Sequence, residues 1–315
     1  MYIGFSEAEN FLRNCEDAVI LTHQNPDGDC IGAGFALKDI LKSLGKRSKV
    51  LCCDEFPKNF DFLTNVDSGD EFEPKAIIAV DIADENLMGS LKDVYGGKIQ
   101  LCIDHHISNK KYAEKTLLRS NASATCEIIY DLAEYMGVMI TKHCATCIYT
   151  GIATDSGCFK YDCTTSRTHE IAAELMKRFD INFARINRYM FDVKSIGRMK
   201  LESAVTKLME NYLDNKLTII AVTQDVMNEM NVEPEELDGI APLTIQLENT
   251  EVGILIRERK DGTFKCSLRS ANNVNVSEIC QTLGGGGHAK AAGCAFTDEL
   301  KVVKKKLIEA VKRAL

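Results

Sequence analysis

The first half of the chain alternates between short apolar runs and longer amphipathic stretches. The apolar runs predict strands at 18–22, 49–52, 76–80 and 100–103. In the longer stretches apolar residues recur at helical intervals, which predicts helices at 31–44, 123–135, 142–153 and about 166–179. Strands that are apolar throughout and alternate with helices are typical of a parallel sheet with helices on both faces. The expected fold class is therefore α/β.

The pattern changes after about residue 184. A charged, poorly patterned stretch predicts a helical connector, and beyond it three strand-like runs lie at 217–222, 252–256 and 263–268. Asp261-Gly262 predicts a hairpin turn, and Thr297 is the expected N-cap of a closing helix. This second part is predicted to be a smaller α/β domain with a mixed sheet. The expected division is a first domain at 1–184, a connector at 185–214 and a second domain at 215–315.

Composition narrows the class of protein. The chain has 315 residues, enough for two domains, and its 45% hydrophobic and 27% charged residues are ordinary for a globular protein. A formal charge of -8 argues against a broad surface for long duplex nucleic acid. No signal peptide is apparent, and no run reaches the roughly 18 apolar residues that a membrane helix needs. We therefore expect a cytoplasmic protein without a membrane partner.

The thirteen cysteines do not form a recognisable metal or disulfide pattern. Their number is odd, and most lie in apolar stretches, where a thiol behaves as a small hydrophobic group. One CxxC spans Cys144 to Cys147, but structural zinc usually needs a second pair at matching spacing. A structural role is expected for these cysteines.

Acidic residues and histidines gather just after the predicted strands. Because the carboxyl ends of parallel strands share one edge of a sheet, residues distant in sequence should meet in one crevice there. Alone, Asp81 is explained as a turn former and His23 as a hydrogen-bonded side chain. Together, five carboxylates and three imidazoles would repel one another unless cations were present. The predicted metal-site residues are His23, Asp27, Asp29, Asp81, Asp104, His105, His106 and, in a glycine-flanked loop after a helix, Asp155.

The ligand types indicate which metal the site holds. Carboxylates with imidazoles and without thiolates suit Mn²⁺ or Mg²⁺ better than structural zinc. The carboxylates are numerous enough for two ions that share a bridging ligand, the arrangement that assists phosphoryl transfer. No serine or cysteine nucleophile is then required.

A glycine run forms a second candidate site. Gly284 to Gly287 allow the backbone to approach a ligand closely, and His288 and Lys290 add positive charge. Residues 251–290 contain six Lys or Arg against four Asp or Glu, in a chain that is acidic elsewhere. Arg257, Arg259, Lys265 and Arg269 could reach a phosphate or stack on a base. A flexible turn and a solvated charged strand face remain the alternatives.

These residues match a known family in order and spacing. The segments His23 to Asp29 (HQNPDGD), Asp81, Asp104-His105-His106 and Asp155-Ser156-Gly157 resemble the four motifs of the DHH phosphoesterases. Gly284 to Gly293 (GGGGHAKAAG) resembles the signature of the DHHA1 domain. One small departure is Ser156, where threonine is commoner. The resemblance spans nearly the whole chain and implies a catalytic DHH domain, a substrate-binding DHHA1 domain and an active site between them.

The resemblance also implies a role for each residue. Asp81 would bridge two manganese ions, Asp104 would orient a ligand, and His106 would contact the phosphate. Magnesium is the alternative metal. The first ion would take His23, Asp27 and Asp81, the second Asp29, Asp81, His105 and Asp155, and the substrate would meet Arg269, Gly285, Gly286, Gly287 and His288.

Length and architecture favour one branch of the family. RecJ exonucleases, family II pyrophosphatases and membrane-anchored cyclic dinucleotide phosphodiesterases each need parts that this sequence lacks. The remaining likeness is to the nanoRNase type, which implies hydrolysis of very short RNA or DNA oligonucleotides to nucleoside 5′-monophosphates, and activity on 3′-phosphoadenosine 5′-phosphate (pAp). A stand-alone cyclic-di-AMP phosphodiesterase and a non-catalytic nucleotide sensor are the alternatives. A homodimer is compatible with the sequence.

Overall fold

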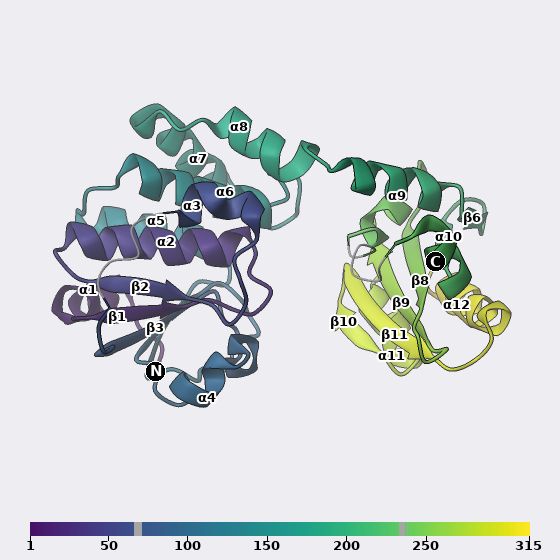
Figure 1. Cartoon of the computed structure of the whole chain (residues 1–315), viewed down its shortest axis with the longest axis horizontal. Helices are drawn as coiled ribbons and strands as arrows, with labels where there is room; N and C mark the ends of the chain where they lie inside the picture. The colour runs from purple at the N-terminus through teal and green to yellow at the C-terminus, as the bar shows by residue number, and fades with distance from the viewer. Residues whose placement is uncertain (66–70, 233–236, 238) are drawn as a thin grey trace. The chain divides into compact units, whose positions relative to one another are not determined.

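The computed structural model describes residues 1–65, 71–232, 237 and 239–315 (Figure 1). They form two compact units, Met1–Val193 and Lys194–Leu315, and each is described by itself. The connector expected at 185–214 spans this division. Its second part is no free linker, because Leu201 and Val205 are buried in a core of the C-terminal unit.

A five-stranded parallel sheet forms the centre of the N-terminal unit, with the strand order β2-β1-β3-β4-β5. The four strands predicted from apolar runs are confirmed. The edge strand β5 was missed because two of its four residues are only half-buried and its sequence, KTLL, begins with a lysine. The strands are β1 Ala18–Leu21, β2 Ser48–Leu51, β3 Ala76–Val80, β4 Leu101–Asp104 and β5 Lys115–Leu118.

Helices cover both faces of this sheet, as expected (Figure 1). On one face α2 (Gly28–Ser43), α5 (Thr125–Met136) and α6 (Lys142–Asp155) bury their apolar sides in the larger core. On the other face η2 (Glu85–Met88) and α4 (Leu91–Tyr95) cover a smaller core. The remaining elements are α1 Phe5–Asn14, η1 Lys58–Phe60, α3 Asp61–Thr64, α7 Ser166–Phe179, α8 Phe183–Asn187 and η3 Arg188–Asp192.

Two helix ends differ from the sequence prediction, and both carry candidate ligands. Helix α2 begins three residues earlier than expected, because the Asp27 carboxylate accepts the backbone N–H groups of Asp29 and Cys30 at 3.1 Å each. Helix α6 continues to Asp155, so the prediction that Asp155 lies in a loop is wrong. The last turn of α6 packs against the start of α2, where a Cβ atom on Gly28 would lie 2.3 Å from Oγ1 of Thr154. The first glycine after the helix is Gly157, at φ +58°.

Glycines let α2 and α6 approach each other closely. A Cβ atom on Gly32 would lie 2.5 Å from the carbonyl oxygen of Cys147. One on Gly151 would lie 2.2 Å from the Cys126 sulfur and 2.8 Å from Oδ1 of Asp29. These distances are far below van der Waals contact, so only glycine fits. The close packing places the first turn of α2 beside the last turns of α6.

The C-terminal unit is built on a six-stranded mixed sheet with the order β10-β11-β9-β8-β7-β6, in which only β7 and β8 pair in parallel. The three predicted strands and the turn at Asp261-Gly262 are confirmed, whereas β6, β10 and β11 were not expected as strands. The strands are β6 Met209–Tyr212, β7 Leu217–Val222, β8 Val252–Glu258, β9 Phe264–Ser270, β10 Gly286–His288 and β11 Ala291–Phe296.

The closing helix α12 runs from Leu300 to Ala314 and buries Val303, Leu307 and Val311, as its apolar stripe predicts. The predicted cap is wrong: Glu299, not Thr297, holds the N-cap position, and its side chain makes no capping bond. The other elements of this unit are α9 Ile196–Thr206, α10 Gln224–Met230, η5 Ala241–Ile245 and α11 Val276–Thr282.

All thirteen cysteines are free thiols. Cys144 and Cys147 are buried in α6, and neither belongs to a group of metal-ligating atoms among the described residues. Within the described part of the chain, no helix is long and apolar enough to cross a bilayer.

The α2–α6 contact gives a test of the fold. Replacing Gly151 with alanine should destabilise the protein by about 1–3 kcal/mol, because the added methyl group overpacks the contact at Cys126 and Asp29. The control is Gly197→Ala in α9, where the nearest neighbouring atom would be 3.7 Å away and alanine should stabilise the helix by about 0.5–1 kcal/mol. Urea denaturation measures both changes. Equal stability of the two variants would contradict the packing role of Gly151.

Candidate metal centre

The structure brings the predicted ligands of the N-terminal unit together at the carboxyl edge of the parallel sheet. His23 and Asp81 follow β1 and β3, and Asp104 is the last residue of β4. Asp27 and Asp29 belong to the first turn of α2, and the last residue of α6 joins them from the helical layer. Three kinds of chain end therefore converge: strand ends, a helix start and a helix end.

His23 is oriented by its own backbone neighbour. Its Nδ1 donates to the carbonyl oxygen of Gln24 at 2.8 Å, because a carbonyl can only accept. The other ring nitrogen, Nε2, then faces Oδ2 of Asp27 at 3.6 Å and Oδ2 of Asp81 at 3.8 Å. These three groups surround one point with nitrogen and oxygen donors.

His105 is held in the same way on the other side of Asp81. Its Nδ1 donates to the carbonyl oxygen of Ala122 at 3.2 Å. Its Nε2 lies 3.6 Å from Oδ1 of Asp81 and 3.3 Å from Oδ2 of Asp155. Such a backbone hydrogen bond at one imidazole nitrogen is the usual means of aiming the other at a metal.

Asp81 lies between these two groups, with one carboxylate oxygen facing each. Oδ2 faces His23, and Oδ1 faces His105. The hydroxyl of Thr125 donates to Oδ1 at 2.8 Å, which fixes the carboxylate. The residue is 2% exposed and has a left-handed backbone at φ +59°, a conformation that is uncommon for residues other than glycine.

Asp29 depends on residues that the sequence did not single out. Its Oδ2 accepts the backbone N–H of Thr125 at 2.6 Å, and its Oδ1 accepts that of Cys126 at 2.9 Å. These amides form the N-terminus of α5, where orphan N–H groups and the helix dipole favour a negative charge. The helix start near Ser123 was visible in the sequence, but its pairing with a residue almost a hundred positions away was not.

Asp104 contacts the third residue of the triplet, His106, and not His105. Its Oδ1 lies 2.7 Å from Nδ1 of His106, and its Oδ2 accepts the side-chain amide of Asn109 at 2.6 Å. Asp104 is fully buried, whereas the His106 side chain is 42% exposed. The second imidazole nitrogen of His106 therefore remains available to a ligand.

Like charges and burial shift the acid–base properties of the centre. Burial raises the pKa of Asp29 to about 7, with help from the charge of Asp81. Burial and the charge of Asp27 raise the pKa of Asp81 to about 6, and burial and the charge of Asp29 raise that of Asp155 to about 7. Burial opposes protonation of His23, but its hydrogen bond with Asp27 raises the pKa to about 9. Without cations the centre therefore holds protons at neutral pH.

The donor set fits divalent metal ions. Asp29, His105 and Asp155 present ligand atoms within 4.8 Å of one another, as do Asp81, His105 and His106. His23 and Asp27 form a further such group with Cys30, a residue absent from the sequence-based ligand set. Burial raises the pKa of the Cys30 thiol well above its usual value, which disfavours it as a ligand. The remaining oxygen and imidazole donors suit Mn²⁺ or Mg²⁺.

The glycine run of the C-terminal unit forms a hairpin rather than a flexible loop. The edge strand β10 pairs with β11, so that Gly287 lies opposite Ala292. A Cβ atom on Gly285 would lie 2.1 Å from the carbonyl oxygen of Gly293, and one on Gly287 would lie 2.6 Å from that of Ala291. His288 is exposed at the edge, and Arg269 is half-buried on β9, where Nη1 donates to the carbonyl oxygen of Leu268. Ala291 on β11 is paired with His288 on β10 and with Arg269 on β9, so His288 and Arg269 lie two strands apart at the same level of the sheet.

Comparison with known proteins identifies both units. The N-terminal domain model of the DHH family matches residues 17–152, and the DHHA1 domain model matches residues 200–315. A relative from Thermus thermophilus, named bifunctional oligoribonuclease and PAP phosphatase NrnA, is 30% identical over 94% of this chain and 89% of its own length. The chain belongs to the DHH family. It is an enzyme, a phosphoesterase, with the acidic centre in its DHH domain.

Two further proteins are similar to this chain, one over part of its own sequence and one in fold. The cyclic-di-AMP phosphodiesterase GdpP of Geobacillus thermodenitrificans is 26% identical over 91% of this chain, but the match spans only 46% of that relative. The crystal structure of an exopolyphosphatase-related protein from Bacteroides fragilis has a TM-score of 0.87 at 24% identity and covers 98% of this chain and 95% of that one. The latter shows a shared fold.

The raised pKa values predict a pH-dependent metal affinity. Metal ions need the unprotonated carboxylates and imidazoles, so ions must displace protons from Asp29, Asp155 and His23. Affinity for Mn²⁺ should therefore rise between about pH 5.5 and 9, with more protons released per ion at pH 6 than at pH 8. Calorimetric titration in buffers of different ionisation enthalpy counts these protons. An affinity that is independent of pH would refute the raised pKa values.

Proposed function

We propose that this DHH protein is a manganese-dependent phosphodiesterase that hydrolyses very short oligonucleotides to nucleoside 5′-monophosphates. The observation that carries the proposal is the arrangement around Asp81, whose two oxygens face separate donor groups. The relative named oligoribonuclease and PAP phosphatase, which matches nearly the whole chain, supports the substrate class. A cytoplasmic location accords with such substrates.

Two ions would share Asp81 as a bridging ligand. When bound, they supply the Lewis acidity that stabilises charge on the phosphate and lowers the pKa of an attacking water. Imidazole ligands favour Mn²⁺ over Mg²⁺, which prefers oxygen donors alone. We assign His23, Asp27 and Asp81 to the first ion, and Asp29, Asp81, His105 and Asp155 to the second.

His106 is suited to binding the substrate phosphate. The hydrogen bond with Asp104 raises the pKa of His106 to about 9, which favours the protonated imidazole. Its Nδ1 donates to Asp104, and Nε2–H is then free to donate to a non-bridging phosphate oxygen. Asp104 acts as a positioning residue, since it holds the ring and its proton without touching substrate.

The hairpin of the DHHA1 domain would bind the other end of the substrate. Gly285, Gly286 and Gly287 expose backbone that a phosphate can approach, and His288 and Arg269 supply positive charge. A site that binds only one end of the RNA needs little positive charge, because it does not contact a long phosphate backbone. A chain with a net charge of -8 could therefore act on short RNA.

Two other substrates have specific support. The name of the Thermus relative includes PAP phosphatase, so we propose activity on pAp as a second reaction. The match to GdpP favours cyclic-di-AMP as the alternative main substrate. A purely non-catalytic sensor is disfavoured, because every residue of the expected ligand set is present and all six ligands lie in the centre.

Substrate length is the direct test of this proposal. With Mn²⁺, RNAs of two to five nucleotides should be hydrolysed at least about tenfold faster per end than a 24-nucleotide strand, because the proposed site grips one end only. Rates on pApA, cyclic-di-AMP and pAp, measured side by side by chromatography, rank the candidate substrates. Equal rates on short and long strands would remove the short-substrate proposal, and a dominant rate on cyclic-di-AMP would replace it.

The bridging role of Asp81 has its own test. Asp81→Asn should lower kcat by at least about a hundredfold, because each ion contributes several kcal/mol and 1.4 kcal/mol is a factor of ten. Metal analysis should show fewer than one Mn²⁺ per chain. The matched control is Asp84→Asn, a change of the same type at an N-cap that asparagine also serves. Retention of two ions by the Asp81 variant would contradict the assignment.

A further inference from the structure

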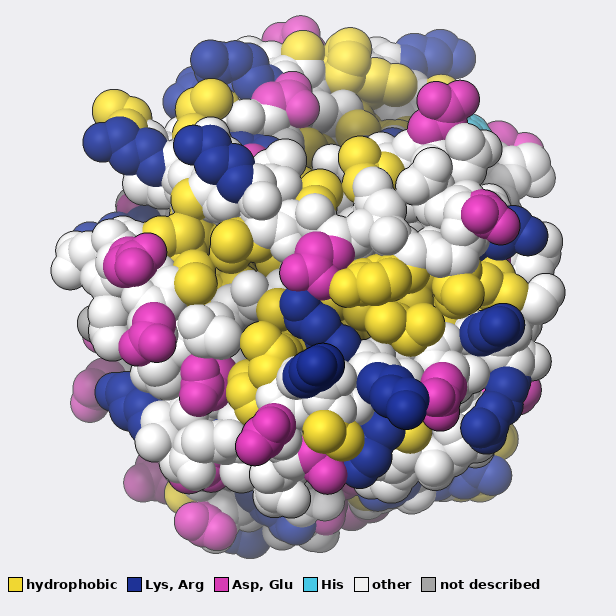
Figure 2. All heavy atoms as spheres, turned by 90° about the vertical axis from the view of Figure 1, so that its right-hand side faces the viewer, with side chains coloured by type: hydrophobic (Ala, Val, Ile, Leu, Met, Phe, Trp, Pro, Cys, Tyr) yellow, Lys and Arg dark blue, Asp and Glu magenta, His cyan; other side chains and the backbone are white. Residues whose placement is uncertain are grey.

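The C-terminal helix α12 has a charge opposite to that of the whole chain. Its fifteen residues include five lysines and one arginine against a single glutamate, whereas the chain carries -8. Lys301 and Lys305 are one turn apart, a spacing at which like charges destabilise a helix by a few tenths of a kcal/mol (about 0.2–0.5). Such a row of exposed cations is stabilised by an anionic partner. Figure 2 shows the corresponding side of the molecule, where lysine and arginine side chains border an apolar band.

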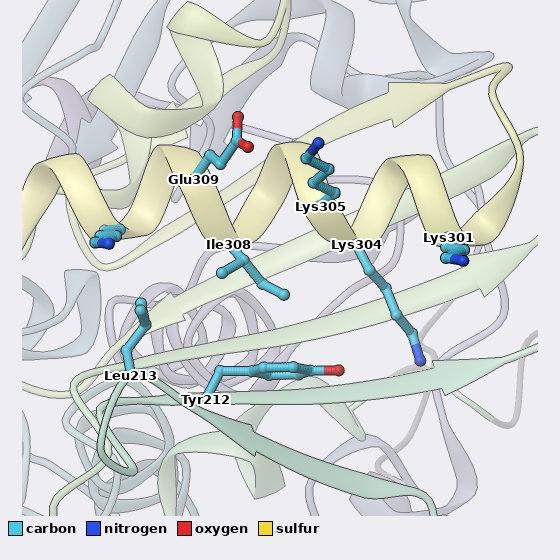
Figure 3. A pocket seen from close by; sticks show the side chains of 8 residues that line it. Tyr212, Leu213, Lys301, Lys304, Lys305, Ile308 and Glu309 are labelled. Atoms are coloured by element: carbon cyan, nitrogen blue, oxygen red, sulfur yellow. The ribbon is translucent and has the colours of Figure 1, made fainter.

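A groove of about 440 Å³ runs between α12 and the edge strand β6. In Figure 3, Ile308 extends from the helix toward the chain segment that carries Tyr212 and Leu213, and Lys304 extends toward the hydroxyl end of Tyr212. The groove is thus apolar at the bottom and basic along the helix. Its lining residues are Tyr212, Leu213, Lys301, Lys304, Lys305, Ile308, Glu309 and Lys312.

Three of the four lysines have their charge available. Lys304 already forms an ion pair, since its Nζ lies 2.8 Å from each carboxylate oxygen of Glu210 and its side chain is only 19% exposed. Lys301, Lys305 and Lys312 are exposed, and no carboxylate oxygen of the described residues lies within 4.0 Å of their Nζ atoms. With Glu309 counted against them, the rim keeps a clear positive excess.

The sheet order separates this groove from the hairpin that we propose for substrate. Strands β6 and β10 are the two opposite edges of the six-stranded sheet. Five strand spacings of about 4.8 Å place them roughly 24 Å apart. A dinucleotide held at β10 therefore cannot also occupy the groove.

We propose that the groove between α12 and β6 is a second binding site for single-stranded RNA, separate from the proposed substrate site at β10. The amines follow one another from Lys301 to Lys312, a distance of roughly 16 Å along the helix. A linear row of cations matches an extended phosphodiester backbone better than it matches one compact phosphate group. Tyr212, Leu213 and Ile308 offer the bases an apolar and aromatic floor. The choice of RNA rests on the proposed function.

Binding of a labelled 12-nucleotide RNA tests this site. The groove variant carries Lys301→Gln, Lys305→Gln and Lys312→Gln. The control carries Lys200→Gln, Lys207→Gln and Lys260→Gln, with the same loss of charge outside the groove lining. Fluorescence anisotropy in EDTA excludes hydrolysis. The groove variant should bind at least about tenfold more weakly, and its slope of log K against log salt should fall by about 2, since each phosphate contact on a single strand contributes about 0.7.

The outcomes separate this proposal from the proposed function. Absence of binding by the wild type, or equal losses in the two variants, would overturn the groove site. Inorganic polyphosphate that competes as well as RNA at equal charge would overturn the RNA assignment. Hydrolysis of a dinucleotide with Mn²⁺ should be the same in the groove variant and the wild type. If neither protein hydrolyses dinucleotides while only the groove variant loses RNA binding, the proposed function fails and the groove stands.

Discussion

Carboxylates crowded into a buried centre are the constraint on which the N-terminal unit depends. Asp29 and Asp81 are 1% and 2% exposed, and burial together with repulsion from neighbouring carboxylates raises the pKa of each. Fixed donor groups in the fold offset this repulsion. They are the backbone amides that start α5, the hydroxyl of Thr125 and the two imidazoles on either side of Asp81. These groups compensate only part of the negative charge of the carboxylates, and divalent ions would neutralise the rest.

The same constraint explains the packing of the helical layer. Two of the carboxylates that must meet lie at the start of α2 and the end of α6, so these helices must approach closely at that end. Gly32 and Gly151 allow this approach, and the position of Gly151 beside Oδ1 of Asp29 shows that packing and chemistry use the same space. A change in the helix contact is therefore also a change in the metal centre.

In the proposed function the two units would bind phosphate in different ways. The DHH domain would hold cations with its acidic residues, and those cations would attract phosphate. The DHHA1 domain would use its own cations and exposed backbone, at the β10 hairpin and along α12. Such a division would allow an acidic chain to bind anionic substrates, because the positive charge is local and each patch is small.

The sequence by itself determined much of this protein. Near-continuous apolar runs fixed the four main strands of the parallel sheet, because buried strands need apolar residues on both faces. The polar residues placed after those strands predicted which side chains would meet, since strand ends share one edge. The family motifs then indicated the chemistry.

Other features were decided only by tertiary structure. Strands β10 and β11 consist largely of glycine and alanine, which have low strand propensity, and they exist because they pair with each other and with β9. Asp155 looked like a loop residue beside a glycine, but packing against α2 extends α6 through it. The two amides that hold Asp29 lie almost a hundred residues away, and Asp104 selects His106 over His105. Local pattern does not encode these pairings, because they depend on which distant backbone groups the folded chain brings within hydrogen-bond reach.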